Sequence, residues 1–170
     1  MPLVLAVVYA FYLLIPYIDP LGANIASFRK YYDAFWVLTS AFLLYVYALL
    51  LAWNLGYYFN WMHFMLPAVA VLWFALGILL EKSKRNWFIG IRTPWTLSSD
   101  MVWKKTHKLA GVLFKIAAGL ALIGLLVPFT EVIVYTVVAP AVAIALVTVV
   151  YSFILYRQEQ IREGNAKSET

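Results

Sequence analysis

The chain has 170 residues and is 65% hydrophobic and 12% charged. Ordinary soluble domains are about 25% charged, and a soluble core of this length could not cover so much apolar surface, so the composition excludes a soluble globular domain and indicates a protein embedded in lipid. The absence of cysteine excludes disulfides and thiolate metal sites. The net charge of +5 favours anionic lipid over nucleic acid as a partner, because the basic residues lie beside apolar stretches.

Five apolar stretches could cross a bilayer as helices, each of which needs about 20 residues. They predict spans near residues 1–18, 34–55, 62–80, 109–127 and 132–156. The first stretch has no basic n-region and no cleavage site, so we interpret it as a short span and not as a signal peptide. Pro140 predicts a kink in the last span. We therefore expect an all-α bundle of five transmembrane helices, residues 1–156, followed by a flexible tail, residues 157–170.

Polar segments connect these spans. Residues 19–33 begin with turn formers, and their second part is expected to form a short helix, capped by Asn24, at the headgroup level. Residues 56–63 and 128–131 predict tight turns. The longest polar segment, residues 81–108, contains seven of the thirteen Lys and Arg and three of the seven Trp. We call it the signature loop and expect it to carry the specific function.

The basic residues orient the chain. With five spans, the connector 19–33, the signature loop and the tail lie on one side of the membrane, and they contain all Lys and Arg except Lys115. Cytoplasmic segments are enriched in Lys and Arg, so this distribution places the N-terminus outside and the C-terminus in the cytoplasm of a multi-pass plasma-membrane protein. Within the signature loop, the cluster Lys82, Lys84 and Arg85 is most simply a contact for anionic lipid.

The middle of the signature loop is unusually apolar. Its side chains Trp87, Phe88, Ile89 and Trp95 are expected to pack back onto the helices or to enter the headgroup region. Arg92 has five fixed donors, which suit a carboxylate, a phosphate or several backbone carbonyls.

A helix is expected to begin near Ser98 and to run unbroken into the fourth span. Ser98 or Ser99 can cap it, and Asp100 lies in its first turn, where the helix dipole favours an acid. The helical spacing places several polar residues on one stripe along this helix. It also predicts an ion pair between Asp100 and Lys104, which lie four residues apart. The stripe consists of Asp100, Lys104, Lys108, Gly111 and Lys115.

Lys115, the charge inside a span, has two interpretations. Its long side chain can snorkel to the nearby interface. Alternatively, it lines a cytoplasm-facing crevice and meets an anionic group, for which Glu81, Asp19 and Asp33 are internal candidates. The sequence leaves both interpretations open.

Catalysis and metal binding are disfavoured. His63 and His107 fall at opposite ends of the membrane, which excludes a shared metal site. Ser98 and Ser99 have no nucleophile elbow around them, and Asp100 is two turns away from His107. We therefore expect no enzymatic activity, no metal and no cofactor.

Residues 90–111, GIRTPWTLSSDMVWKKTHKLAG, strongly resemble the signature of the SdpI-type membrane proteins. In that family a Gly-x-Arg-x-Pro-Trp-Thr segment precedes a Trp-x-x-Thr-His helix. Asp19 to Phe35 resembles the family's first cytoplasmic connector, and the matching stretches span most of residues 15–125. Many members carry further N-terminal membrane segments, whereas this sequence begins almost directly with the first span.

The resemblance implies which residues form the binding site, and it implies no catalytic residue, metal or cofactor among them. By position, these residues are Arg92, Thr93, Pro94, Trp95, Thr96, Ser98, Ser99, Asp100, Trp103, Lys104, Thr106 and His107. The family is named for an immunity protein that protects a bacterium from its own secreted peptide toxin. It is also described as a receptor that, when toxin binds, holds a repressor at the membrane.

Two functions follow as expectations. The first is toxin immunity, signalling through a cytoplasmic regulator that contacts residues 81–108, or both, with a peptide toxin and a repressor as partners. The alternative is a small transporter or lipid-binding protein with a polar crevice around Lys115. An oligomer is compatible with either function.

Overall fold

The computed structural model describes residues 1–127 and 131–168, with the backbone alone for 166–168, and this described part is helical without any strand. Most of the turn expected at 128–131 and the end of the tail lie outside the described residues. Two further short helical turns are a 3₁₀ turn at Gly124–Leu126 and a π-helical turn at Val134–Val138. The α-helices are α1 Pro2–Ile18, α2 Gly22–Ser27, α3 Arg29–Asn54, α4 Trp61–Lys82, α5 Pro94–Ser98, α6 Asp100–Ile123 and α7 Ala139–Ser168.

Among the described residues, four helical segments are long and apolar enough to cross a membrane. They are Arg29–Asn54, Trp61–Lys82, Asp100–Leu126 and Val134–Asn165. α1 is apolar but has 17 residues, so at about 1.5 Å per residue it is shorter than a hydrocarbon core of about 30 Å. The expected all-helical membrane architecture is confirmed, and the fifth span stays a prediction.

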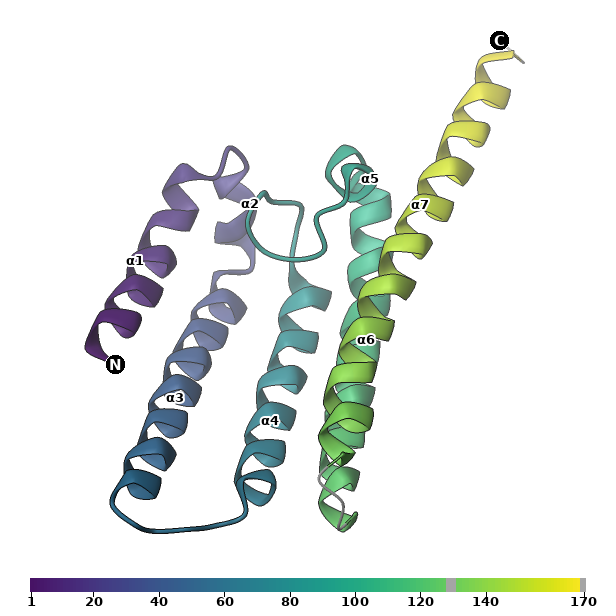
Figure 1. Cartoon of the computed structure of the whole chain (residues 1–170). Coiled ribbons are helices and arrows are strands. Elements are labelled where there is room, and N and C mark those ends of the chain that lie inside the picture. The colour runs from purple at the N-terminus through teal and green to yellow at the C-terminus, as the bar shows by residue number, and fades with distance from the viewer. Residues whose placement is uncertain (128–130, 169–170) are drawn as a thin grey trace.

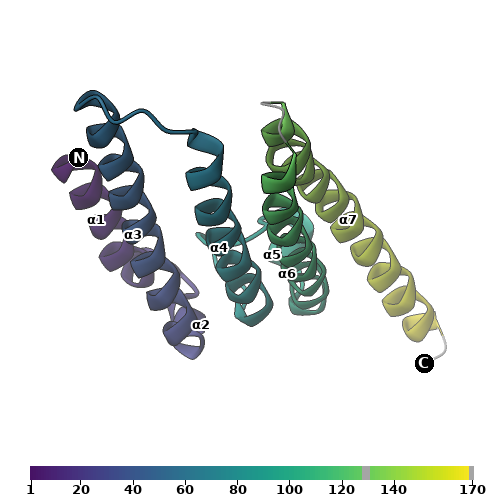
Figure 2. The same ribbon diagram turned by 90° about the horizontal axis from the view of Figure 1, so that it is seen from below.

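The long helices lie side by side in a row that follows chain order, α1, α3, α4, α6 and α7 (Figures 1 and 2). Their main contacts are between neighbours in this order, with α4 and α6 packed most extensively. The expected bundle of helices is therefore arranged as an open row. Lipid tails can cover both faces of a row, so no hydrophobic force requires it to close on itself.

The polar segments gather at one end of this row (Figure 1). We call it the loop end; it contains residues 19–28, the segment between α4 and α6, and the C-terminal half of α7. The opposite end, the turn end, contains the connection 55–60 between α3 and α4. The alternation of the two ends along the chain agrees with the distribution of Lys and Arg in the sequence.

The first connector departs from the expected single helix. Two helices, α2 and α3, meet at Phe28, whose φ of −122° and ψ of 23° interrupt the helix. The break lets Ile25, Phe28 and Tyr32 enter one buried cluster with Ile15 of α1. Asn24 therefore lies inside α2 and does not cap it, and α3 begins five residues earlier than the predicted span.

The last helix also differs from its predicted bounds, because α7 continues to Ser168 instead of ending at Tyr156. At its start, the π-helical turn ends two residues before Pro140. Proline has no N–H and crowds the carbonyl four residues earlier, and a wider turn accommodates both effects. The irregularity predicted at Pro140 thus lies just before it.

Candidate functional site

The segment between α4 and α6 folds onto the helices as a compact unit. We call residues 83–99, which include α5, the cap. Phe88 and Ile89 pack on the buried cluster of α1 to α4, and Trp95 lies on Phe153 of α7 with ring centroids 5.0 Å apart. The predicted packing of apolar loop residues is confirmed for these three, whereas Trp87 is 50% exposed.

Asn86 organises the turn that begins the cap. Its fully buried Oδ1 accepts hydrogen bonds from the backbone N–H of Phe88 at 3.0 Å and of Ile89 at 2.6 Å. Its Nδ2 donates to the carbonyls of Lys84 at 2.9 Å and Ile89 at 3.0 Å. One side chain thereby satisfies four backbone groups that are shielded from water.

The first connector holds the cap from the α1 side. Asp19 is only 6% exposed, and its carboxylate accepts from the backbone N–H of Leu21 at 2.7 Å and of Trp87 at 2.9 Å. The Asn24 amide donates to the carbonyl of Arg85 at 2.8 Å. Bonds to an ionised acceptor are stronger than neutral ones, so Asp19 is the main tie between these distant segments.

His107 supports the cap from α6. Its ring stacks on Trp103 at 3.9 Å, Nε2 lies 2.9 Å from the backbone N of Ile91, and Nδ1 lies 2.9 Å from the Trp103 carbonyl. An N–H can only donate and a carbonyl can only accept, so Nδ1 carries the proton and the imidazole is neutral. Gly90, with φ +115°, passes so close that a Cβ there would lie 2.3 Å from Nε2.

Two buried threonines close the cap against α7. Thr93 and Thr96 form a reciprocal capping box at the start of α5. Thr96 Oγ1 also donates to the carbonyl of Ile91 at 2.7 Å, and Thr93 Oγ1 lies 3.1 Å from Ser152 Oγ of α7. The cap is thus joined to α7 as well as to α6.

Ser99 is the residue that caps α6. Its Oγ accepts from the backbone N–H of Val102 at 3.2 Å and donates to Glu159 of α7 at 2.9 Å. The predicted helix start and the position of Asp100 in the first turn are confirmed, with Ser99 as the cap and not Ser98.

The predicted pairing of Asp100 with Lys104 is wrong. Asp100 Oδ1 lies 2.9 Å from Nε of Arg85, whose Nη1 donates to the Leu97 carbonyl at 2.9 Å. Arg85 reaches Asp100 because that backbone bond already holds its guanidinium in place, whereas the flexible Lys104 side chain remains exposed.

Lys115 forms an internal ion pair directly below the cap. Its Nζ lies 2.7 Å from Oε1 of Glu81 at the end of α4, and both side chains are less than one-third exposed. Asp19 serves the cap and Asp33 pairs with Arg29 at 2.6 Å, so Glu81 is the partner among the three candidates. The charge meets an internal carboxylate and does not snorkel alone.

Two glycines let α4 and α6 approach closely enough for this pair. A Cβ at Gly77 of α4 would lie 2.7 Å from the Gly111 carbonyl, and one at Gly111 of α6 would lie 2.6 Å from the Gly77 carbonyl. The stem of Lys115 covers Gly77, and the stem of Glu81 covers Gly111. Each helix thus supplies one glycine and, four residues later, one charge.

The signature residues separate into two groups. Those directed inward are Thr93, Thr96, Ser99, Trp103, Thr106 and His107, all buried except the half-buried Ser99. Those at the surface are Arg92, Pro94, Ser98, Asp100 and Lys104, with Trp95 half-buried. Arg92 also donates to the Trp87 carbonyl at 2.6 Å. Thr106 Oγ1 has no hydrogen-bond partner among the described residues. The inward group builds the cap, and the surface group is what a partner could contact.

The geometry does not assemble a nucleophile with a base. Both ring nitrogens of His107 bond to backbone atoms, and Ser99 bonds to Glu159. His63 lies in the first turn of α4 and His107 lies in the first half of α6, and these two helices begin at opposite ends of the row (Figure 1). No group of three or more potential metal ligands occurs in residues 1–127 and 131–168.

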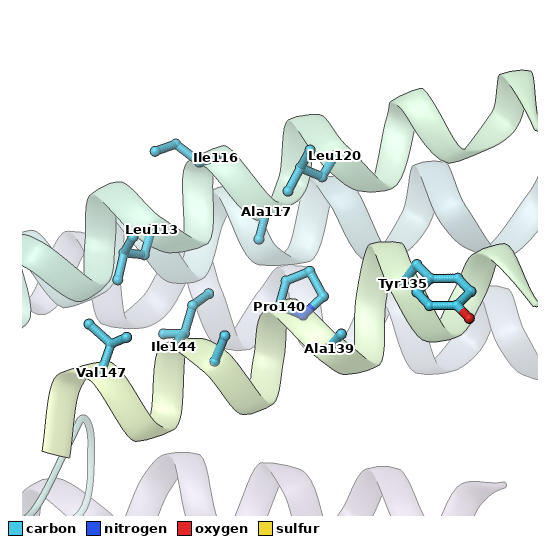
Figure 3. Close-up of a pocket in the computed structure, with 10 residues that line it drawn as sticks. Leu113, Ile116, Ala117, Leu120, Tyr135, Ala139, Pro140, Ile144 and Val147 are labelled. Atoms are coloured by element: carbon cyan, nitrogen blue, oxygen red, sulfur yellow. The ribbon is translucent and has the colours of Figure 1, made fainter. Parts of the chain in front are cut away.

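A groove of about 380 Å³ opens between α6 and α7 in their apolar parts (Figure 3). Leu113, Ala117, Pro140 and Ile144 face it, and its wall is apolar apart from the Tyr135 hydroxyl. Binding sites usually add convergent polar groups to an apolar wall, so this groove suits a lipid chain better than a specific polar ligand.

Sequence reasoning missed two residues on which the cap depends, Asp19 and Asn86. Asp19 is a single acidic residue between an apolar helix and Pro20. This position could have indicated that its carboxylate accepts hydrogen bonds from nearby backbone N–H groups. Asn86 stands between a basic cluster and three apolar residues, which is typical of an Asx turn.

Fold and site together define a multi-pass helical membrane protein in which a folded cap closes one end of a tightly packed helix pair. The family model described as the SdpI/YfhL protein family matches residues 82–152, from the end of α4 through the cap and α6 into α7. The match supports the resemblance to SdpI-type membrane proteins that residues 90–111 predicted. No curated protein and no solved structure gives a significant match.

Proposed function

We propose that this protein is a non-enzymatic immunity protein that protects the cell against a membrane-active peptide toxin and signals to a cytoplasmic regulator through the cap. The proposal includes five spans in the plasma membrane, with the N-terminus outside and the loop end in the cytoplasm. The concentration of Lys and Arg in the loop-end segments supports this orientation.

One observation supports the proposal most directly, the structure of the cap. Hydrogen bonds within the protein hold its interior together, and the cap thereby presents surface residues in fixed positions. Backbone groups bind Asn86, Thr96 and His107 on the inside, while Arg92 and Trp95 reach the surface from the same short segment. Arginine and tryptophan are among the residues that most often contribute a large share of the binding energy at an interface. A rigid support reduces the conformational entropy that these side chains lose on binding. This is the arrangement expected of a recognition surface.

The experiment is a challenge of cells expressing single variants with membrane-active bacterial peptides. Trp95→Ala and Arg92→Ala should each lower the tolerated peptide concentration about 30-fold, the effect of losing a residue worth about 2 kcal/mol of binding. Trp87→Ala is the matched control, because Trp87 is an exposed cap tryptophan outside the family signature. Unchanged survival of the Trp95 and Arg92 variants at normal expression would refute the proposal.

The alternative, a small transporter or lipid-binding protein, stays a prediction. The pairing of Lys115 with Glu81 argues against a vacant charged crevice at Lys115. A polar cavity of about 560 Å³ lies next to Glu81, at the start of the cap. This cavity favours the lipid-binding part of the alternative over transport.

A further inference from the structure

A polar pocket of about 560 Å³ lies at the loop end, beside the cap. Its lining residues belong to α2, the end of α4, the start of the cap and the beginning of α6. Its volume falls within the range of about 300–1,000 Å³ that is typical of ligand sites. We call it the basic pocket; it is lined by Asn24, Glu81, Lys82, Ser83, Lys84, Arg85, Asp100, Trp103 and Lys104.

The charges of the basic pocket do not balance. Both of its carboxylates are already paired, Glu81 with Lys115 at 2.7 Å and Asp100 with Arg85 at 2.9 Å. Three lysines remain without a carboxylate partner in the described part of the chain. These are Lys82, Lys84 and Lys104, all exposed. The pocket therefore carries an uncompensated positive charge.

The level of the pocket in the membrane indicates the source of its ligand. Glu81 is the first charged residue after the uncharged stretch 34–80, so the pocket lies where the apolar part of α4 ends. Trp103, 2% exposed, forms a wall with its indole N–H already bonded to the Ser83 carbonyl at 3.2 Å. Phosphates of the lipid headgroups occupy this level, and lysines there attract anionic lipid.

We propose that the basic pocket binds the phosphate of an anionic phospholipid headgroup, with Lys82, Lys84 and Lys104 neutralising it. Arg85 closes the pocket while remaining paired with Asp100. The ion pairs of Glu81 and Asp100 offset the charge of both carboxylates and so reduce their repulsion of the phosphate. This site is independent of the toxin-immunity role and would hold if that role failed.

The test uses the purified full-length protein in a non-ionic detergent and a fluorescent short-chain phosphatidylglycerol as the probe. We expect the protein to bind this probe at least tenfold more tightly than phosphatidylcholine with the same chains. One lysine near a lipid surface contributes about 1 kcal/mol, about fivefold in affinity, so the double variant Lys84→Gln/Lys104→Gln should weaken binding about 25-fold.

The control is the double variant Lys105→Gln/Lys108→Gln, which removes the same charge from exposed positions on α6 outside the pocket. It should change affinity less than twofold at the same ionic strength. An equal loss in both double variants would overturn the site, because diffuse attraction would then explain the binding. Equal affinity for phosphatidylcholine would also overturn it. Inorganic phosphate competing at micromolar concentration would identify free phosphate as the ligand and reject the lipid.

Discussion

The two ends of the helix row use the same kinds of residue for different purposes. Each end has a glycine with positive φ, Gly90 at +115° and Gly56 at +92°. A Cβ at Gly90 would strike His107, whereas a Cβ at Gly56 would meet no atom of another segment within 4 Å. The turn end reverses the chain beside a cluster of aromatic rings, whereas the loop end adds a folded segment that packs on the helices.

The asparagines and histidines show the same contrast. Asn86 is fully buried and makes four hydrogen bonds, whereas the exposed Asn60 caps α4 through one bond from Met62. His107 is buried under the cap, and His63 is exposed. Matched substitutions at the two ends therefore measure how much of the stability and function depends on the cap.

The largest contrast is expected for Gly90→Ala against Gly56→Ala. Both variants force a side chain into positive φ, which costs about 1–2 kcal/mol. Gly90→Ala must also displace His107, so we expect a total loss of about 3 kcal/mol in the free energy of unfolding. Thermal unfolding in detergent, followed by circular dichroism, measures both. Equal losses would show that the cap is not packed on His107.

Asn86→Ala against Asn60→Ala comes next. Removing Asn86 leaves several shielded backbone groups without partners, and we expect a loss of about 2–3 kcal/mol. Removing Asn60 costs only a helix cap, about 1 kcal/mol. Limited proteolysis should cleave the Asn86 variant within the cap and leave the Asn60 variant intact. A cap that resists the protease in both variants would contradict the network described for Asn86.

Lys115→Met tests the ion pair beneath the cap, and no such pair occurs among the described residues of the turn end. The variant leaves Glu81 without its partner. Because both side chains are partly exposed, we expect the free energy of unfolding to fall by about 2 kcal/mol, which is less than the cost of breaking a fully buried pair. Adding Glu81→Gln should restore at least half of the loss. If the single variant is as stable as the parent, the pair contributes nothing and Lys115 snorkels.

His107→Phe against His63→Phe should give a smaller difference. Phenylalanine keeps the stacking on Trp103 but provides no acceptor for the Ile91 N–H, a cost of about 1–2 kcal/mol. His63→Phe at an exposed site should stay within about 0.5 kcal/mol. Hydrogen exchange at the Ile91 amide should accelerate in the His107 variant alone; unchanged exchange would rule out that bond.

The smallest contrast is within the loop end, between neighbouring serines. Ser99→Ala removes the cap of α6 and the bond to Glu159, for a loss of about 1 kcal/mol. Ser98 is exposed and bonds only to the Trp95 carbonyl, at 3.1 Å, so Ser98→Ala should cost less than about 0.5 kcal/mol. The reverse order in thermal unfolding would make Ser98 the true cap.

Local features of this chain were predictable from its sequence. Uncharged stretches locate the long helices, although α3 begins earlier and α7 ends later than the stretches predict. The Ser98–Ser99–Asp100 sequence predicts the start of α6. The row arrangement was not predictable, because any apolar helix face is equally stable against lipid or another helix.

Contacts between distant segments were also beyond reach of the sequence. The Asp19 carboxylate accepts a hydrogen bond from the Trp87 N–H, 68 residues away in the sequence. Asp100 forms its ion pair with Arg85 and not with Lys104, which is nearer in the sequence. Helical spacing predicts only neighbours on the same helix. The partner of Lys115 was one of three candidates, and only the close approach of Gly77 and Gly111 selects Glu81.

The central claim is that the cap faces the cytoplasm while the turn end faces outward. The chain has no cysteine, so single cysteines can be introduced at the exposed Ser98 and Tyr57 without any other change. In intact cells, a membrane-impermeant maleimide should label the Tyr57→Cys variant and should label Ser98→Cys only after permeabilisation. Labelling of Ser98→Cys in intact cells, with Tyr57→Cys protected, would contradict the orientation and the function assigned to the cap.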